Sequence, residues 1–306
     1  MYGEDANHSA HALLCMTPLR GTYSLWFLVV SNAILAITST LGNTLILIAL
    51  YKESSLHPPS KILLRSLALT DFFVGIFLEP LVVMTLMTAE YGSLPPCYYI
   101  ITVCFFIGMP LFFASLFTLT AISVDRLLAL LLGIRYRQVV TIKRALLVVI
   151  CFWTLSVGFS FWGNFNPNIS PYYGSIAVTL CLVISTCCYS RIYQKLLRHQ
   201  IQVQEHAHQG QQNGHAPLNI GRYRKTVSSA LWVQFTVLVC YLPMSVLLVA
   251  MAVKGVTLSL LVVWTFTITL VLFNSSLNPI LYCWKMREVR RAVIDTIKKI
   301  LCSFSG

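Results

Sequence analysis

Charge is scarce in this chain, and acidic charge is the scarcest. Only 10% of its 306 residues are charged, with 10 Asp and Glu against 22 Lys and Arg. Hydrophobic residues make up 57% of the chain, and the mean hydropathy is +0.75. Because a typical soluble domain has about 25% charged residues, this composition excludes a soluble globular protein and indicates an integral membrane protein.

Long apolar segments occur seven times along the chain. Each holds enough apolar residues for the roughly 20 that a membrane-spanning helix needs. No segments alternate apolar and polar residues over about ten positions, which excludes a transmembrane β-barrel. We therefore predict an all-α protein, a bundle of seven transmembrane helices. The segments are Tyr23–Tyr51, Lys61–Thr88, Pro96–Leu132, Ala145–Trp162, Tyr172–Leu197, Thr226–Val253 and Leu258–Trp284.

Basic residues are nearly absent from one side of these segments. Of the 22 Lys and Arg, only Arg20 and Lys254 lie there. Membrane proteins concentrate Lys and Arg in their cytoplasmic loops, so we expect the N-terminus outside and the C-terminus in the cytoplasm. The net charge of +12 then belongs to a cytoplasmic face that meets anionic lipids and acidic partners rather than nucleic acid.

The two ends of the chain differ from the spans. Residues 1–22 are polar and lack the short apolar core of a cleavable signal peptide, so this extracellular tail is expected to precede a first span that directs insertion. Residues 23–284 form the transmembrane domain. In residues 285–306, apolar side chains recur at spacings of three and four opposite basic ones. This pattern predicts a short amphipathic helix on the cytoplasmic membrane surface.

Three positions are candidates for modification. Asn7 and Asn168 each begin an Asn-X-Ser sequence on the outer side, the acceptor pattern for N-glycosylation, although Pro171 weakens the second. Cys302, near the end of the amphipathic segment, is a candidate for palmitoylation. A thiol without such a role is the equal alternative.

The chain has 10 cysteines, and most of them lie in the spans or on the cytoplasmic side, where thiols stay reduced. Only Cys15 and Cys97 are clearly external. They are a candidate disulfide pair, and two free thiols remain the alternative because the sequence does not fix their separation.

The only low-complexity stretch lies between the fifth and sixth spans. Residues 200–214 are rich in Gln, His and Gly. Such a polar composition predicts a flexible cytoplasmic loop.

The last span contains an unusual polar run, Asn274 to Pro279. Proline removes a backbone donor, and Asn and Ser bring polar groups into a solvent that cannot pair them. A simple membrane anchor would avoid such a run, so we expect it to face other helices that supply partners; a proline kink whose free groups are satisfied by nearby serines is the alternative. The chain also carries Gly42-Asn43, Leu67-Ala68-Leu69-Thr70-Asp71, Asp125-Arg126-Leu127, Trp153, Tyr189-Ser190-Arg191-Ile192-Tyr193, Cys240-Tyr241-Leu242-Pro243 and Asn278-Pro279-Ile280-Leu281-Tyr282.

In this order and on these spans, the motifs resemble those of rhodopsin-class G-protein-coupled receptors over nearly the whole chain. The resemblance implies a plasma-membrane receptor, not an enzyme, that transmits the signal of an extracellular ligand to a heterotrimeric G protein. Arg126 would leave Asp125 to meet the G protein, with Tyr189 and Tyr282 receiving it. The residues implied in coupling and activation are Asp125, Arg126, Tyr189, Tyr241, Pro243, Asn278, Pro279 and Tyr282.

Asp71 lies inside the second span, where a carboxylate costs about 2.5–3.5 kcal/mol to insert and needs partners. In the resembling family, the positions of Ser115, Asn274, Ser275 and Asn278 form a sodium-binding pocket with this Asp. The resemblance therefore implies an allosteric sodium ion and no other cofactor. A hydrogen-bonded Asp71 with water and no ion is the alternative.

Several residue types that are absent from particular positions restrict the class of ligand that we expect. The loop after the fourth span has no cysteine and the fifth span has no proline, which resembles the melanocortin, adenosine, cannabinoid and lysolipid receptors. Gly108 occupies the place of the Asp used by biogenic-amine receptors, so we do not expect an amine; a peptide or another small molecule remains open. Glu79 is the one acid left in the expected pocket, and an acid without a ligand role is the equal alternative. The ligand-binding candidates are Glu79, Gly108 and Tyr241.

The start of the sixth span lacks an acidic residue. In many members of the resembling family, an acid there holds the counterpart of Arg126. Here Gly221–Thr226 contains three basic residues instead. Like charges repel, so we expect the protein to signal measurably without ligand. A pair between Asp125 and Arg126 that keeps the protein quiet is the alternative.

Other classes of membrane protein fit the sequence less well. Transporters usually show inverted repeats and paired broken helices, and the sequence shows neither. A retinal-binding opsin needs a Lys in the last span, which has none. An intramembrane enzyme needs clustered His, Asp or Glu, whereas only Asp71 and Glu79 lie mid-membrane. A transporter or carrier without receptor activity is the remaining alternative.

Overall fold

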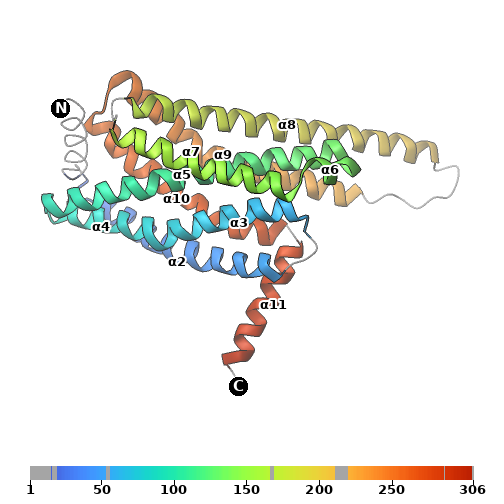
Figure 1. The fold of residues 1–306 in the computed structure, drawn as a ribbon, viewed down its shortest axis with the longest axis horizontal. Coiled ribbons are helices and arrows are strands. Elements are labelled where there is room, and N and C mark those ends of the chain that lie inside the picture. Colours follow the sequence, from blue (N-terminus) through green and yellow to red (C-terminus); the bar gives the residue numbers. More distant parts are fainter. Residues whose placement is uncertain are drawn as a thin grey trace.

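The computed structural model describes residue 15 and residues 19–52, 56–165, 169–210, 220–285 and 287–304. All regular structure in these residues is helical, and seven of the helical segments are long and apolar enough to cross a membrane. The predicted all-α fold with seven spans is confirmed, and a short helix follows the last span (Figure 1). Asn7 and Asn168 lie outside the described residues, as do the side chains of Tyr282 and Cys302.

The spans begin and end close to the predicted apolar segments, because a chain in lipid must satisfy its backbone polar groups internally. Gly255, with a φ of 73°, follows the sixth span and ends it in the left-handed conformation that glycine adopts readily. The spans are α2 (Tyr23–Lys52); α3 (Pro58–Phe73), η1 (Val74–Leu78) and α4 (Glu79–Glu90) together; α5 (Leu94–Leu132); α7 (Ile142–Phe165); α8 (Ser170–Gly210); α9 (Ile220–Lys254); and α10 (Leu258–Lys285). The short elements are η2 (Gly133–Arg135), α6 (Tyr136–Val139) and α11 (Arg287–Phe304).

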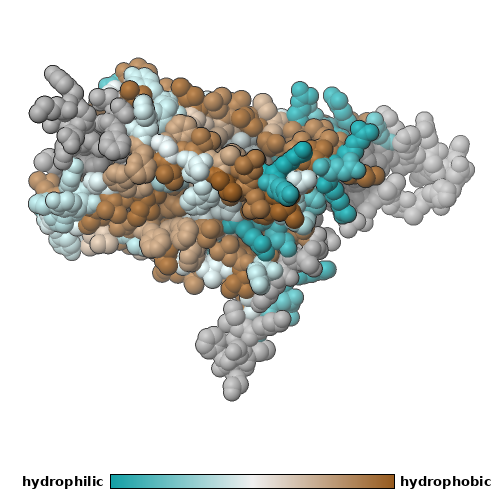
Figure 2. Space-filling model, in the orientation of Figure 1, coloured by the Kyte–Doolittle hydropathy of each residue, from teal (hydrophilic) through white to brown (hydrophobic). Residues whose placement is uncertain are grey.

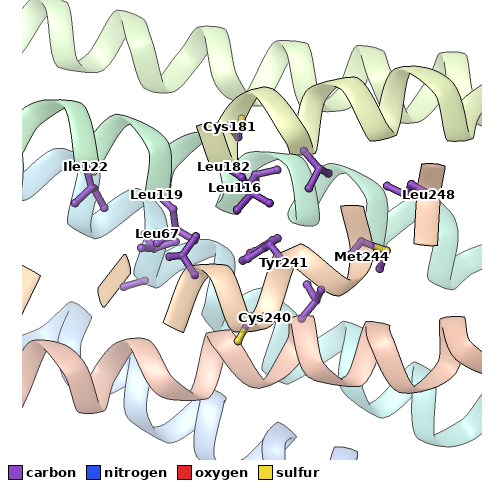
Figure 3. Close-up of a cluster of buried hydrophobic side chains, with 14 of the residues drawn as sticks. Leu67, Leu116, Leu119, Ile122, Cys181, Leu182, Cys240, Tyr241, Met244 and Leu248 are labelled. Carbon is purple, nitrogen blue, oxygen red and sulfur yellow. The ribbon is translucent and has the colours of Figure 1, made fainter. Parts of the chain in front are cut away.

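Helix α5 contacts α3, α4, α7 and α8, while α9 packs on α8 and α10, and α10 packs on α2. Apolar side chains fill the space between these helices. Figure 3 shows Tyr241 among Leu67, Leu116 and Met244, all of which are buried. Lipid tails are as apolar as these side chains, so the helices associate through close packing rather than through removal of apolar surface from water.

Two glycines bring α2 close to its neighbours. A Cβ atom on Gly42 would lie 2.9 Å from Cγ of Pro279 in α10, and one on Gly75 in η1 would lie 2.7 Å from the backbone nitrogen of Thr40. Larger residues would force these helices apart. Small residues serve the same purpose at many helix interfaces in membranes.

The second span contains a π-helical turn, η1. The backbone N–H of Glu79 donates to the carbonyl of Val74, five residues back. Such a turn rotates each residue less about the helix axis than an α-helix does, and it is common at functional sites. It shifts the face of α4 relative to α3, and both Asp71 and Glu79 are fully buried as a result.

Helix α8 corrects one prediction. The stretch 200–214 was expected to be a flexible loop, yet α8 continues without interruption to Gly210 and projects beyond the other spans in Figure 1. Residues 211–214 lie outside the described residues. The helix continues this far because Gln, Glu and Ala are favourable helix formers and no Gly or Pro occurs between Gln200 and Gln209.

The two ends of the bundle differ in polarity. Hydrophobic residues cover its middle, and hydrophilic residues gather at the end where α6 lies (Figures 1 and 2). Arg137, Lys143 and Arg144 are exposed there. Helix α11 leaves the same end at a steep angle. It buries Val289 against the bundle and exposes Arg290, so it is amphipathic.

The chain segment before α2 is fastened to the opposite end of the bundle. Cys15 and Cys97, at the start of α5, form a disulfide with a Cα–Cα distance of 5.9 Å. The backbone N–H of Gly21 also donates to Oε2 of Glu90 at 2.8 Å. Cys15 and Gly21 therefore lie against the ends of α4 and α5 that contain Glu90 and Cys97.

Candidate functional site

A cluster of polar side chains surrounds Asp71 in the interior of the bundle. Asp71 is completely buried, and its two carboxylate oxygens accept hydrogen bonds from two residues of α10. Ser275 Oγ donates to Oδ1 at 2.8 Å, and Asn278 Nδ2 donates to Oδ2 at 2.7 Å. These charge-assisted bonds are the partners that a carboxylate in a membrane interior requires.

Asn43 explains how α10 tolerates Pro279. Proline has no N–H, so the carbonyl of Ser275, four residues earlier, lacks its helical donor. Nδ2 of Asn43 donates to this carbonyl at 3.0 Å. Ser39, one turn before Asn43, donates to the backbone carbonyl of Asp71 at 2.9 Å. Helices α2, α3 and α10 are therefore joined around the proline by side-chain hydrogen bonds.

Ser115 and Asn274, the other residues expected in a sodium pocket, are also buried, but neither bonds to Asp71. Ser115 Oγ and Asn274 Nδ2 have no hydrogen-bond partner. Hard cations take oxygen ligands, so the Ser115 oxygen fits a cation, whereas Asn274 could contribute only its carbonyl oxygen. Within the described residues, no group of three or more His, Cys, Asp and Glu could hold a metal ion.

A cavity of about 240 Å³ lies between the spans and descends to this cluster. Ser115, Tyr241 and Ser275 line its inner end. Phe112 contacts Tyr241 with ring centroids 5.8 Å apart, and Phe105 stacks on Trp264 at 6.2 Å. The Tyr241 hydroxyl lies close to Ser115 without a well-formed hydrogen bond.

The cavity includes two of the three ligand-binding candidates. Gly108 and Tyr241 line it, whereas Glu79 does not, although its neighbours Leu78 and Val82 do. Glu79 is fully buried, and neither of its carboxylate oxygens has a hydrogen-bond partner. Its contact with a ligand therefore stays a prediction.

Asp125, at the opposite end of the bundle, is held by two hydroxyl groups. Ser60 Oγ donates to its Oδ2 at 2.9 Å, and the Tyr136 hydroxyl donates to its Oδ1 at 2.6 Å. Ser60, Asp125 and Tyr136 are all buried. The ring of His57 contacts that of Tyr136 in a tilted arrangement, with ring centroids 4.9 Å apart. We call Ser60, Asp125 and Tyr136 the inner triad.

Arg126 is half-buried beside the inner triad. No ion pair forms between Asp125 and Arg126, both of which are described residues, and the Asp125 oxygens accept hydrogen bonds from two hydroxyls instead. Arg126 lies close to Tyr136 and to the buried Tyr189 of α8. Pro243 lies inside α9 and is exposed on its outer face.

Sequence reasoning missed the roles of Ser60 and Tyr136. A buried Asp at the end of a span does require donors, which could have prompted a search for hydroxyl groups in nearby loops. The sequence gives no means of choosing among them.

Comparison with known families gives one match. The family described as "7 transmembrane receptor (rhodopsin family)" matches residues 42–174 and 162–282. Together these ranges cover most of the chain and include six of the seven spans in full and the first span from Gly42 onward.

Proposed function

Because the chain belongs to the rhodopsin family of seven-transmembrane receptors, we propose that it is a plasma-membrane receptor that binds an extracellular ligand in the cavity and activates a heterotrimeric G protein. It is a multi-pass signalling receptor, not an enzyme. Its N-terminus lies outside the cell, since all but two of its 22 Lys and Arg fall on the other side. The G protein binds around Arg126.

One observation carries this proposal: Ser275 belongs both to the cavity and to the Asp71 cluster. It lines the inner end of the cavity and donates to Asp71. Asp71 is joined in turn to Asn278, next to Pro279. A ligand that moves Ser275 therefore alters the bonds around the kink of α10. A receptor needs such a bistable element, whose equilibrium the ligand biases.

The direct test uses the purified chain in a bilayer. We expect it to accelerate guanine-nucleotide exchange on at least one heterotrimeric G protein, even without ligand. Solute flux into vesicles containing the same chain tests the remaining alternative, a carrier. Flux without nucleotide exchange on any G protein class would overturn the proposal.

The ligand is not a biogenic amine of the usual kind, because Gly108 provides no carboxylate at the position that binds the amine. Gly108 lines the cavity, and a Cβ added there would lie 3.0 Å from Leu78. An acidic side chain at this position would therefore displace its neighbour.

We further propose that Asp71 and Ser115 hold an allosteric sodium ion. The unpartnered Ser115 oxygen supports this proposal. Sodium should stabilise one conformation and lower ligand-independent nucleotide exchange on the order of fivefold, because an effector shifts populations only by its differential affinity. Asp71→Asn should abolish the sodium effect, measured against potassium at equal ionic strength.

Glu79→Gln is the matched control, since Glu79 is a second buried acid of the same span. Its exchange should remain sensitive to sodium. If nucleotide exchange in Asp71→Asn remains sensitive to sodium, the proposed site is wrong. If both Asp71→Asn and Glu79→Gln lose their sodium sensitivity, the ion binds between the two carboxylates.

The inner triad should set the level of signalling without ligand. Tyr136→Phe removes one of the two donors that keep Asp125 from pairing with Arg126. The freed oxygen can then pair with Arg126, and a partly exposed pair is worth about 1 kcal/mol. We expect basal exchange to fall on the order of fivefold. Tyr99→Phe, at an exposed tyrosine on the outer side, should leave it unchanged; a rise in Tyr136→Phe would show that the triad restrains the receptor instead.

A further inference from the structure

The cavity contains hydroxyl groups and many apolar side chains, but among the described residues that line it none is charged. We propose that its ligand is an uncharged amphiphile with one long apolar chain and a small head group that donates hydrogen bonds. This inference rests on the proposed function, because it takes the cavity as the ligand site. It concerns the charge, length and polarity of the ligand.

The shape of the cavity favours a long chain. Val74 and Ala89 both line it and are roughly 20 Å apart along the second span, at about 1.5 Å per residue. Between them the walls are mainly aromatic, aliphatic and methionine side chains, including Phe105, Trp264 and Met244. A peptide would bring backbone N–H and C=O groups into contact with these walls, and each unsatisfied group is costly there.

The charges around the cavity exclude an ionised head group. An ion without a partner is expensive to bury, and no lining side chain offers it one. An anion would also approach two buried carboxylates, Asp71 and Glu79. A cationic head group would meet neither carboxylate on the wall, because neither Asp71 nor Glu79 lines the cavity.

The hydroxyl groups of the cavity favour a head group that donates. Thr85 and Thr265 both line the cavity and donate their own protons to the carbonyls of Leu81 and Val262. A hydroxyl oxygen has two acceptor lone pairs, so each can still accept a hydrogen bond, although Thr85 Oγ1 also lies 3.6 Å from Cys104 Sγ. Ser115 Oγ, at the inner end, has no partner. A primary amide or an alcohol would match these acceptors.

The test compares three probes that share one chain and differ in charge: oleamide, sodium oleate and oleylamine. The receptor is reconstituted in nanodiscs at about pH 8, where the free acid and amine are charged. Binding is followed as the shift of the thermal unfolding midpoint with probe concentration. We expect oleamide to stabilise the receptor saturably, with a half-saturating concentration at least about tenfold lower than those of the two charged probes.

Stronger binding of oleate or oleylamine would overturn the proposal, as would the absence of saturable stabilisation by oleamide. Loading oleamide into the bilayer before reconstitution, or adding it from the aqueous phase, distinguishes a membrane source from an external one. Ligand-independent nucleotide exchange is measured in the same preparation. A receptor that exchanges nucleotide but ignores all three probes refutes the ligand class alone, whereas one that lacks exchange refutes the proposed function.

Two glycines provide a matched pair of variants. Gly174 of α8 lines the cavity, and a Cβ there meets only Leu248, at 3.6 Å. Gly158 of α7 is exposed, with nothing within 4 Å of an added Cβ. Gly174→Phe should fill the cavity and remove stabilisation by oleamide, whereas Gly158→Phe should retain it. Equal responses of the two variants would contradict the site.

A charge introduced into the wall gives an independent readout if Gly174→Phe does not fold. Thr265→Lys places a cation on the cavity side of α10. We expect it to reverse the preference, so that oleate binds at least about tenfold more tightly than to the unchanged receptor, while oleylamine gains nothing. If the three probes bind this variant in the same order of affinity as the unchanged receptor, they bind at a site other than the cavity.

Discussion

Replacing Arg126 by Gln is expected to reduce G-protein activation to the level of empty bilayers, a loss of at least about 100-fold. Arg126 carries a permanent charge and is half-buried next to the buried Asp125. No ion pair holds it to Asp125, since Ser60 and Tyr136 occupy that carboxylate. Arg126 is therefore available to donate hydrogen bonds to a partner protein. Gln keeps part of this capacity but lacks the charge and the fork of donors.

Nucleotide exchange at equal receptor density measures this effect. Arg137→Gln is the matched control, because Arg137 is exposed in the same region and its loss removes the same charge. It should weaken association only modestly, and less so at high salt. Unchanged exchange in Arg126→Gln would refute the role of Arg126. Equal losses in both variants would mean that Arg126 contributes only as one basic charge among others.

The number of spans and most of their ends were predictable from the sequence, because hydrocarbon imposes a simple constraint. Any stretch of about 20 apolar residues must satisfy its backbone internally. The π-helical turn η1 was not predictable. It depends on the close approach of Gly75 to Thr40 of another span, and such a contact leaves no periodic signal. The helical extension to Gly210 was missed because polar composition was given more weight than helix propensity.

Of the polar sites, too, one could be predicted from the sequence and another could not. Asp71, Ser275 and Asn278 could be grouped beforehand because the motifs that contain them resemble those of a receptor family in which these positions form one pocket. The structure adds the link from Asn43 to the carbonyl that Pro279 leaves free. The inner triad could not be grouped, because Ser60 and Tyr136 lie in separate, polar parts of the chain where many hydroxyls compete. Burial selects among them, and burial is a tertiary property.

The disulfide between Cys15 and Cys97 gives the second large effect. Cys15→Ser or Cys97→Ser should lower the free energy of unfolding by about 2 kcal/mol, near the lower end of the usual range. The bond closes a separation of 82 residues, which would favour a larger value for a chain that unfolds completely. An unfolded membrane protein keeps its spans helical and inserted, so its chain has less entropy for the cross-link to remove.

The double variant should be no less stable than the single ones, because both changes remove the same bond. Denaturant unfolding in bilayers measures this, and a reducing agent should destabilise the unchanged protein to the same extent while leaving the double variant unaffected. Cys151→Ser, at an exposed free cysteine of α7, is the control and should have little effect. Additive losses would mean that each thiol acts through its own packing.

Because Ile101, one turn after Cys97, lines the cavity, the single variants should also weaken stabilisation by a ligand that reaches the outer end of the cavity.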